Sequence, residues 1–209
     1  MKIILASKSK YKIQELKKII KDFTPIDPLY DESTLKQQDL SVSDLVLKLS
    51  QKKAEAAEEM IKDKYNDYLI IGADQICHLN DPNEQCKVNQ DKLFSKPRNF
   101  ENAKKQLQQM SGRNHFLSTG VYVKSSDGRD QSIVSTTQLT MRELNNEQIT
   151  NYLDLDLPFD CAGSYKIESF GINLFTNIVS PDFTGIIGIP LLQLSNLLRD
   201  HFELDLLGF

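Results

Sequence analysis

The chain contains 209 residues, of which 40% are hydrophobic and 26% are charged. This composition excludes a disordered protein, and the length suits about one domain that buries its core without disulfides or metals. The formal net charge of −4 argues against a general nucleic-acid-binding protein, because such proteins require a basic surface. We therefore expect one domain over residues 1–209, whose elements could form two lobes.

The cysteines and apolar runs give no indication of secretion or membrane insertion. Cys77, Cys86 and Cys161 are an odd set without C-x-x-C spacing, so neither a disulfide framework nor a zinc site is predicted. No run approaches the roughly 18 apolar residues of a membrane span, and the apolar start is too short for a signal peptide. We expect a cytoplasmic protein without a membrane partner.

Strand and helix patterns alternate in the first half of the chain. Apolar runs predict strands over Lys2–Ala6 and Tyr68–Ala73, the second of them buried on both faces. Ser41 begins a helix with a Ser-x-x-Asp capping pattern. Helical spacing marks two more helices, one at Ile13, Leu16, Ile19 and Ile20 and one at Phe100, Ala103, Leu107 and Met110.

The second half of the chain is richer in strands. Ser126-Asp127-Gly128-Arg129 predicts the turn of a hairpin between strands over 115–124 and 131–141. Three further segments are a short helix from Asn145 to Tyr152, an irregular stretch over 157–183 and a helix that begins at Pro190. The order of elements predicts an α/β fold with a mixed twisted sheet flanked by helices.

Residues 78–94 are predicted to be a polar insertion into this pattern. They contain Pro82 and five Asn or Asp residues, which are typical of loops. The segment directly follows the second predicted strand, so we expect it to lie beside any ligand pocket at the end of that strand.

Common nucleotide-binding and catalytic motifs are absent from the sequence. It contains no G-x-G-x-x-G or G-x-x-x-x-G-K-[ST] loop, which argues against Rossmann and P-loop proteins. H-E-x-x-H and G-x-S-x-G are also missing, which argues against a zinc protease and a common serine hydrolase. Function must therefore be inferred from residues that depart from their local pattern.

The first predicted helix begins with lysines, although helix N-termini favour carboxylates. Lys8, Lys10 and Lys12 all lie in the strand-to-helix junction Ser7–Lys12. The unpaired N–H groups and the dipole of a helix N-terminus are positive, so a bound phosphate would relieve this conflict. The alternative is a lysine-rich surface that tolerates the repulsion.

Lys53 and Asp74 are charged residues in otherwise apolar patterns. Lys53 shares the apolar face of its predicted helix, so it either extends outward to solvent or faces a cavity that holds an anion. Asp74 directly follows a buried strand, where α/β proteins bind ligands, although it could also simply form a turn. Together they predict a pocket with lysines on one side and carboxylates on the other, namely Asp74 and either Asp31 or Glu32.

In this setting the sequence resembles the Maf family of nucleoside triphosphate pyrophosphatases nearly from end to end. Its segment Leu5–Leu16 is similar to the family's L-A-S-x-S-P-R-R-x-E-L-L motif. Six further motifs follow in the family's order: Asp31-Glu32, Lys53-Ala54, Gly72–Gln75, Lys96-Pro97, Ser111–Gly120, and Cys161–Tyr165 completed by Ile186–Pro190.

The resemblance implies hydrolysis of a nucleoside triphosphate to the monophosphate and pyrophosphate, with a divalent metal such as magnesium or manganese. Asp74 would be the catalytic carboxylate, either as a base or through the metal, and Glu32 would help to hold the metal. The triphosphate and the leaving pyrophosphate would be bound by the Ser7 hydroxyl and by the lysines Lys12, Lys53 and Lys96. The nucleotide is then the expected partner, and a homodimer is expected only by analogy with the family.

Three positions associated with substrate choice resemble the family's 7-methyl-GTP branch. The branch that prefers dTTP or UTP carries Arg, Thr and Gln there, whereas the other branch carries an aromatic residue, Gln and Glu. The matching residues of this chain are Tyr11, Gln75 and Glu168. Because methylation at N7 makes guanine cationic, Tyr11 would gain a cation–π attraction, and Glu168 would accept hydrogen bonds from N1–H and N2–H.

Departures from the family pattern affect substrate identity more than reaction type. Lys10 replaces the proline, Tyr11 and Lys12 stand at the arginine positions, and Ser95 replaces a glycine. Lysine lacks the planar fork with which arginine binds phosphate oxygens. Other functions stay open. The protein could be a pyrophosphatase of the inosine-triphosphatase type or a pyrophosphatase specific for dTTP and UTP. It could also be a non-catalytic, nucleotide-sensing regulator of cell division.

Overall fold

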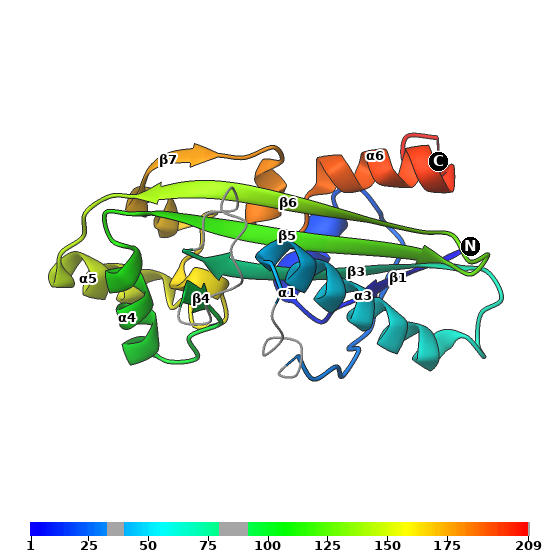
Figure 1. The fold of residues 1–209 in the computed structure, drawn as a ribbon, viewed down its shortest axis with the longest axis horizontal. Coiled ribbons are helices and arrows are strands. Elements are labelled where there is room, and N and C mark those ends of the chain that lie inside the picture. The colour runs from blue at the N-terminus through cyan, green and yellow to red at the C-terminus, as the bar shows by residue number, and fades with distance from the viewer. Residues whose placement is uncertain (33–39, 80–91, 209) are drawn as a thin grey trace.

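One seven-stranded sheet runs through residues 1–32, 40–79 and 92–208, the part of the chain that the computed structural model describes (Figure 1). Its strands are β1 (Lys2–Ala6), β2 (Thr24–Pro25), β3 (Tyr68–His78), β4 (Leu93–Phe94), β5 (Asn114–Ser125), β6 (Asp130–Met141) and β7 (Phe175–Val179). The order is β2-β1-β3-β5-β6-β7, and β4 also pairs with β3. β1 is parallel to β2 and β3, and the other pairs are antiparallel, which confirms the predicted mixed sheet.

Helices cover both faces of this sheet (Figure 1). They are α1 (Lys10–Leu16), α3 (Val42–Ile61), α4 (Phe100–Met110), α5 (Asn146–Asp156), α6 (Leu191–Phe202) and the short 3-10 helices η2 (Ala162–Ser164), η3 (Phe170–Leu174) and η4 (Phe183–Ile186). α3 packs on one face, and α1 and α6 pack on the other. α4 and α5 enclose a further core at the far end of β5 and β6.

The alternation of side chains along β3 distributes its residues between these two faces. Leu69 and Ile71 pack in the core that contains α1 and α6, whereas Ile70 packs against α3. Side chains of a strand point alternately to opposite faces, so a strand that is covered on both faces has a continuous apolar run. The same alternation directs Asp74 toward α3 and Gln75 toward the face of α1 and α6.

Two glycines allow α3 to lie unusually close to the sheet. A Cβ atom at Gly72 would lie 2.1 Å from the backbone oxygen of Ser50, and one at Gly120 would lie 2.5 Å from that of Val46. Such distances are far below van der Waals contact, so the helix backbone occupies the space of the missing side chains. This close approach brings the middle of α3, and with it Lys53, to the edge of β3.

The predicted elements are present, with differences at their ends. β3 continues to His78 instead of ending at Ala73, and α5 continues to Asp156 instead of Tyr152. α1 ends at Leu16, before the last two apolar residues that were assigned to it. The irregular stretch over 157–183 contains the edge strand β7, which the sequence did not predict.

The predicted insertion over residues 78–94 is wrong at both of its ends. His78 is the last residue of β3, and Leu93 and Phe94 form β4, which pairs with Cys77 and His78. Residues 80–91 lie outside the described part of the chain, so their predicted loop character stays a prediction. None of the described helices combines the length and apolarity that crossing a bilayer requires.

Candidate active site

A gap in strand pairing along β3 creates the site. On this edge of β3, the pairing with β1 ends at Gly72, opposite Ala6, and the pairing with β4 begins at Cys77. Within the described residues, Ala73–Ile76 therefore have no strand neighbour on this edge, while β5 pairs along the other. Asp74 lies inside this gap and not at the strand end, which corrects its predicted position. It still follows the point where parallel pairing stops.

A pocket of about 1030 Å³ occupies this gap. It extends from the β1–α1 junction across β3 to the segment after α5 and is large enough for a nucleotide-sized ligand. All nine predicted site residues line it: Ser7, Tyr11, Lys12, Glu32, Lys53, Asp74, Gln75, Lys96 and Glu168. Of the two candidate acidic residues before the second helix, Glu32 lines the pocket and Asp31 does not.

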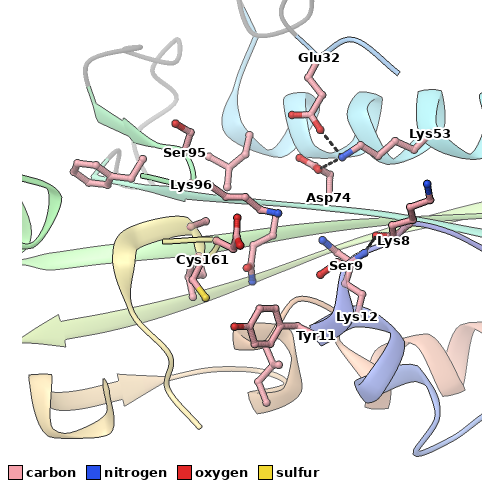
Figure 2. A pocket seen from close by; sticks show the side chains of 18 of the residues that line it. Lys8, Ser9, Tyr11, Lys12, Glu32, Lys53, Asp74, Ser95, Lys96 and Cys161 are labelled. Atoms are coloured by element: carbon pink, nitrogen blue, oxygen red, sulfur yellow. Dashed lines mark hydrogen bonds and ion pairs between the residues drawn. The ribbon is translucent and has the colours of Figure 1, made fainter. Parts of the chain in front are cut away.

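The acidic side of the pocket is organised around Lys53 (Figure 2). Its Nζ atom lies 2.6 Å from Glu32 Oε1 and also pairs with Asp74 Oδ1. Burial disfavours the ammonium ion, but the charges of Asp74 and Glu32 and hydrogen bonds to both raise the pKa of Lys53. Of the two positions predicted for Lys53, solvent or a cavity, the structure shows the cavity. There Lys53 holds the two carboxylates close together.

The opposite side of the pocket is basic. Lys12 and Lys96 extend into the same space from α1 and from the segment after β4 (Figure 2). Burial lowers the pKa of Lys12 to about 8, and the positive charges of Lys53 and Lys96 add to this effect against the attraction of Asp74 and Glu32. Three ammonium groups thus repel one another across the pocket. A polyanion bound between them would relieve this repulsion.

The start of α1 has no internal compensation for its positive end. Its first turn contains no acidic residue, and the side chain of Ser9 makes no capping hydrogen bond. The Ser9 N–H instead donates to Ser7 Oγ at 3.1 Å. The predicted conflict of charges at this junction is therefore present in the structure.

The end of the pocket remote from Lys53 contains an aromatic ring and acidic groups. Burial raises the pKa of Tyr11, and a hydrogen bond with Cys161 and the charges of Glu168 and Asp160 raise it further. Tyr11 and Cys161 both line the pocket (Figure 2). At the rim, Arg98 pairs with Asp160 at 2.8 Å.

Several pocket residues were missed by sequence reasoning. Lys8 lines the pocket, and its Nζ atom lies 3.2 Å from Asp27 Oδ2. Arg98, Asp160 and Cys161 also line it. Lys8 and Cys161 stand inside the motifs quoted above, which could have marked them, whereas the other contacts depend on tertiary structure and leave no local pattern.

The carboxylates of the pocket fit a divalent cation that is also bound by substrate. Glu32 and Asp74 present oxygen atoms to one position, which the Lys53 ammonium occupies. No group of three or more His, Cys, Asp or Glu suited to a metal is found among the described residues. Magnesium is commonly held by only one or two carboxylates together with phosphate oxygens and water, so this donor pair is sufficient for it.

Fold and pocket together define an α/β protein with a site for a small polyanionic ligand. Sequence comparison identifies it further. The sequence model of the family described as Maf-like protein matches residues 2–201, and the chain belongs to this family. This confirms the resemblance inferred from the motifs.

Named relatives cover nearly the whole chain. A protein of Aliivibrio fischeri named 7-methyl-GTP pyrophosphatase is 37% identical over 199 residues, which are 95% of both chains. One with the same name from Bdellovibrio bacteriovorus is 35% identical over 198 residues, which cover 95% of this chain and 96% of the relative. The solved structure of the Staphylococcus aureus Ham1 protein matches 68% of this chain and 72% of its own, with 17% identity and a TM-score of 0.43.

Proposed function

We propose that this protein is a metal-dependent pyrophosphatase that converts 7-methyl-GTP to the monophosphate and pyrophosphate. The observation that carries the proposal is the division of one pocket into a lysine-and-carboxylate end and an aromatic-and-carboxylate end. The first end suits a triphosphate, and the second suits a cationic base. The names of the relatives, which cover about 95% of the chain, support the same substrate.

The basic and acidic side chains would share the work at the triphosphate. Lys12 and Lys96 would pair with its phosphate oxygens and offset the charge that develops on the leaving pyrophosphate. Asp74 would accept a proton from the attacking water as the water oxygen bonds to phosphorus and the bridging bond between the α and β phosphates breaks. A cation held by Asp74 and Glu32 would supply Lewis-acid polarisation of the phosphate.

Lys53 would have two successive partners in this scheme. In the protein without ligands it neutralises Glu32 and Asp74, which otherwise would repel each other at short range. When substrate arrives, its ammonium would become available to a phosphate oxygen without leaving the pocket. The close carboxylate pair is therefore kept in position before the cation is bound.

At the other end of the pocket, charge would select the base. Tyr11 would place its ring against the methylated guanine, whose positive charge gains about 0.5–2 kcal/mol over the neutral base from an aromatic face. Glu168 would accept the N1–H and N2–H donors, which a pyrimidine does not offer as a pair. Both groups thus favour the same base for different reasons.

Pyrophosphate release from a panel of triphosphates tests this proposal. We expect 7-methyl-GTP to give a higher kcat/KM than GTP, ITP, dTTP or UTP, with magnesium or manganese required and chelator inhibiting. Asp74→Asn should lower kcat at least ~100-fold. Asp200→Asn, at an exposed surface pair on α6, serves as the matched control. If Asp74→Asn retains turnover, the assignment of Asp74 as the catalytic carboxylate is wrong. If the protein prefers ITP or dTTP, the proposed substrate 7-methyl-GTP is wrong.

A further inference from the structure

The side-chain amide of Gln75 donates its hydrogens to the protein and not into the pocket. Gln75 Nε2 lies 2.7 Å from Gly185 O, 3.2 Å from Ile186 O and 3.1 Å from Thr119 Oγ1. An amide nitrogen carries only two hydrogens, so these acceptors use its entire donor capacity. The reverse orientation of the amide would direct an oxygen at two carbonyl oxygens, which is repulsive. The nitrogen is therefore not available to a bound base.

Two of the three acceptors of Gln75, Gly185 O and Ile186 O, belong to the end of η4, directly before the loop that leads to α6. Gly185 O accepts hydrogen bonds from Gln75 Nε2, from Thr119 Oγ1 at 3.2 Å and from Gly188 N at 3.2 Å. Three donors on one carbonyl fix the path of this loop relative to β3 and β5. Gln75 is separated from Gly185 by 110 residues in the sequence, so the contact connects distant parts of the chain.

The same loop forms the surface against which Lys12 lies. A Cβ atom at Gly188 would be 3.5 Å from Lys12 Cγ, 3.7 Å from Cε and 3.9 Å from Nζ. The Lys12 side chain, from Cγ to the ammonium, thus passes close to Gly188. Gly188 adopts a φ of 125°, which residues other than glycine rarely adopt, so the loop shape and the glycine are linked.

We propose that Gln75 is a positioning residue that holds the η4–α6 loop and thereby sets the position of the Lys12 ammonium. At this substrate-choice position Gln75 would thus act through the loop and not through a hydrogen bond from its amide nitrogen to the base. The inference rests on the proposed triphosphate substrate, because it assigns Lys12 to the phosphates. Period-two alternation explains the arrangement: Asp74 serves one side of the pocket and its neighbour Gln75 serves the other.

The consequence is a loss of phosphate affinity that does not depend on the base. Gln75→Met keeps the side-chain length but removes both donors, and Gln75→Glu presents a carboxylate to two carbonyl oxygens. We expect Gln75→Met to weaken binding of inorganic tripolyphosphate about 10-fold, as the loss of one well-made hydrogen bond would. KM for 7-methyl-GTP and for GTP should rise by the same factor. Gln75→Glu should be at least as impaired.

A double-mutant cycle distinguishes positioning from direct contact. Tripolyphosphate affinity is measured by calorimetry for the wild type, Gln75→Met, Lys12→Met and the double variant. If Gln75 acts through Lys12, the ~10-fold effect of Gln75→Met disappears in the Lys12→Met background, because coupled residues are not additive. Additive effects would overturn the inference. So would unchanged tripolyphosphate affinity together with an altered preference between 7-methyl-GTP and GTP.

Thr119→Val provides a second route to the same loop. It removes one donor to Gly185 O and one of the three acceptors of Gln75 Nε2, but it leaves the contacts of Gln75 with Gly185 and Ile186 in place. We expect it to weaken tripolyphosphate binding about 2- to 3-fold with no change in base preference, even if the Gln75 variants fold poorly. No effect in a folded Thr119→Val protein would count against the inference. If the wild-type protein binds tripolyphosphate but releases no pyrophosphate from any triphosphate, the proposed function is wrong. The inference about Gln75 would not be affected by that result.

Discussion

The lowered pKa of Lys12 makes alkaline pH a selective perturbation of the site. Burial and the neighbouring ammonium groups lower this pKa to about 8, well below the ordinary value of 10.5. A group with this pKa is about 90% charged at pH 7 and about 10% charged at pH 9. Neutral Lys12 cannot pair with a phosphate oxygen. We therefore expect kcat/KM, which reports the free enzyme, to fall about 10-fold over this interval.

Comparison with Lys12→Arg isolates the contribution of this one residue. A guanidinium stays charged throughout the range, whereas ionisation of the substrate and of the other lysines affects both proteins equally. The assay is initial-rate pyrophosphate release at pH 7, 8 and 9 with saturating magnesium. We expect the ratio of kcat/KM for Lys12→Arg to that for the wild type to rise about 10-fold from pH 7 to pH 9. This expectation holds whatever the absolute rate of the variant.

A constant ratio would refute this reasoning. It would mean either that Lys12 remains charged to pH 9 or that its charge does not contribute to the reaction. Stability separates the two cases. If the pKa of Lys12 is lower in the folded than in the unfolded protein, the folded state binds fewer protons between about pH 8 and pH 10.5, so stability rises with pH in that window. Lys12→Met should therefore stabilise the protein at pH 7, and this gain should disappear toward pH 10.

Three further predictions test other parts of the molecule. Tyr11→Ala should reduce the preference for 7-methyl-GTP over GTP by about 2- to 30-fold, and Tyr11→Phe should retain most of it; equal discrimination by Tyr11→Ala would exclude stacking. Lys8→Met should raise the KM for triphosphate several-fold, whereas Lys10→Met, outside the pocket lining, should stay within about 2-fold of the wild type in the same assay. Gly72→Ala should lower the free energy of unfolding by more than ~2 kcal/mol in chemical denaturation, because its Cβ would lie 2.1 Å from a backbone oxygen of α3; a smaller loss would mean that the helix shifts freely.

Elements with a strong periodic pattern were predictable from the sequence. β1, α3, α4, the β5–β6 hairpin and α6 all have apolar spacing and capping or turn residues that agree with their fold. β2 and β4 have only two residues each and exist through pairing with distant strands, so no local pattern could predict them. β3 was predicted too short because Asp74 interrupts its apolar run, although that side chain faces the pocket and not the core.

Helix ends and loop contacts depended on tertiary interactions in the same way. The side chain of Asp156 accepts hydrogen bonds from Ser169 Oγ at 2.7 Å and from Gly171 N at 3.1 Å, which accompany the extension of α5 beyond Tyr152. The acidic side chain is thereby satisfied in a buried position. Sequence spacing offers no information about partners that lie 13 and 15 residues away in an irregular segment.

The candidate site was more predictable than the loops around it because its residues conflict with their local environment. A lysine on an apolar helix face, lysines at a helix N-terminus and a carboxylate in a buried strand each require a partner that the local sequence does not supply. Lys53 resolves two of these conflicts by pairing with Asp74 and Glu32. Gln75 presented no such conflict, since an amide is neutral, and its contact with Gly185 could be found only in the structure.

The register of β3 is the feature on which both halves of the site depend. Asp74 and Gln75 are adjacent in the sequence, yet strand alternation sends one to the carboxylate pair at α3 and the other to the loop that supports Lys12. A shift of one residue in the pairing of β3 with β5 would exchange these faces and separate Asp74 from Lys53. Gly72, which pairs with Tyr122, and Gly120, which pairs with Asp74, oppose such a shift because only glycines fit beneath α3. Close packing of a helix on a strand thus fixes the positions of groups on both sides of the sheet.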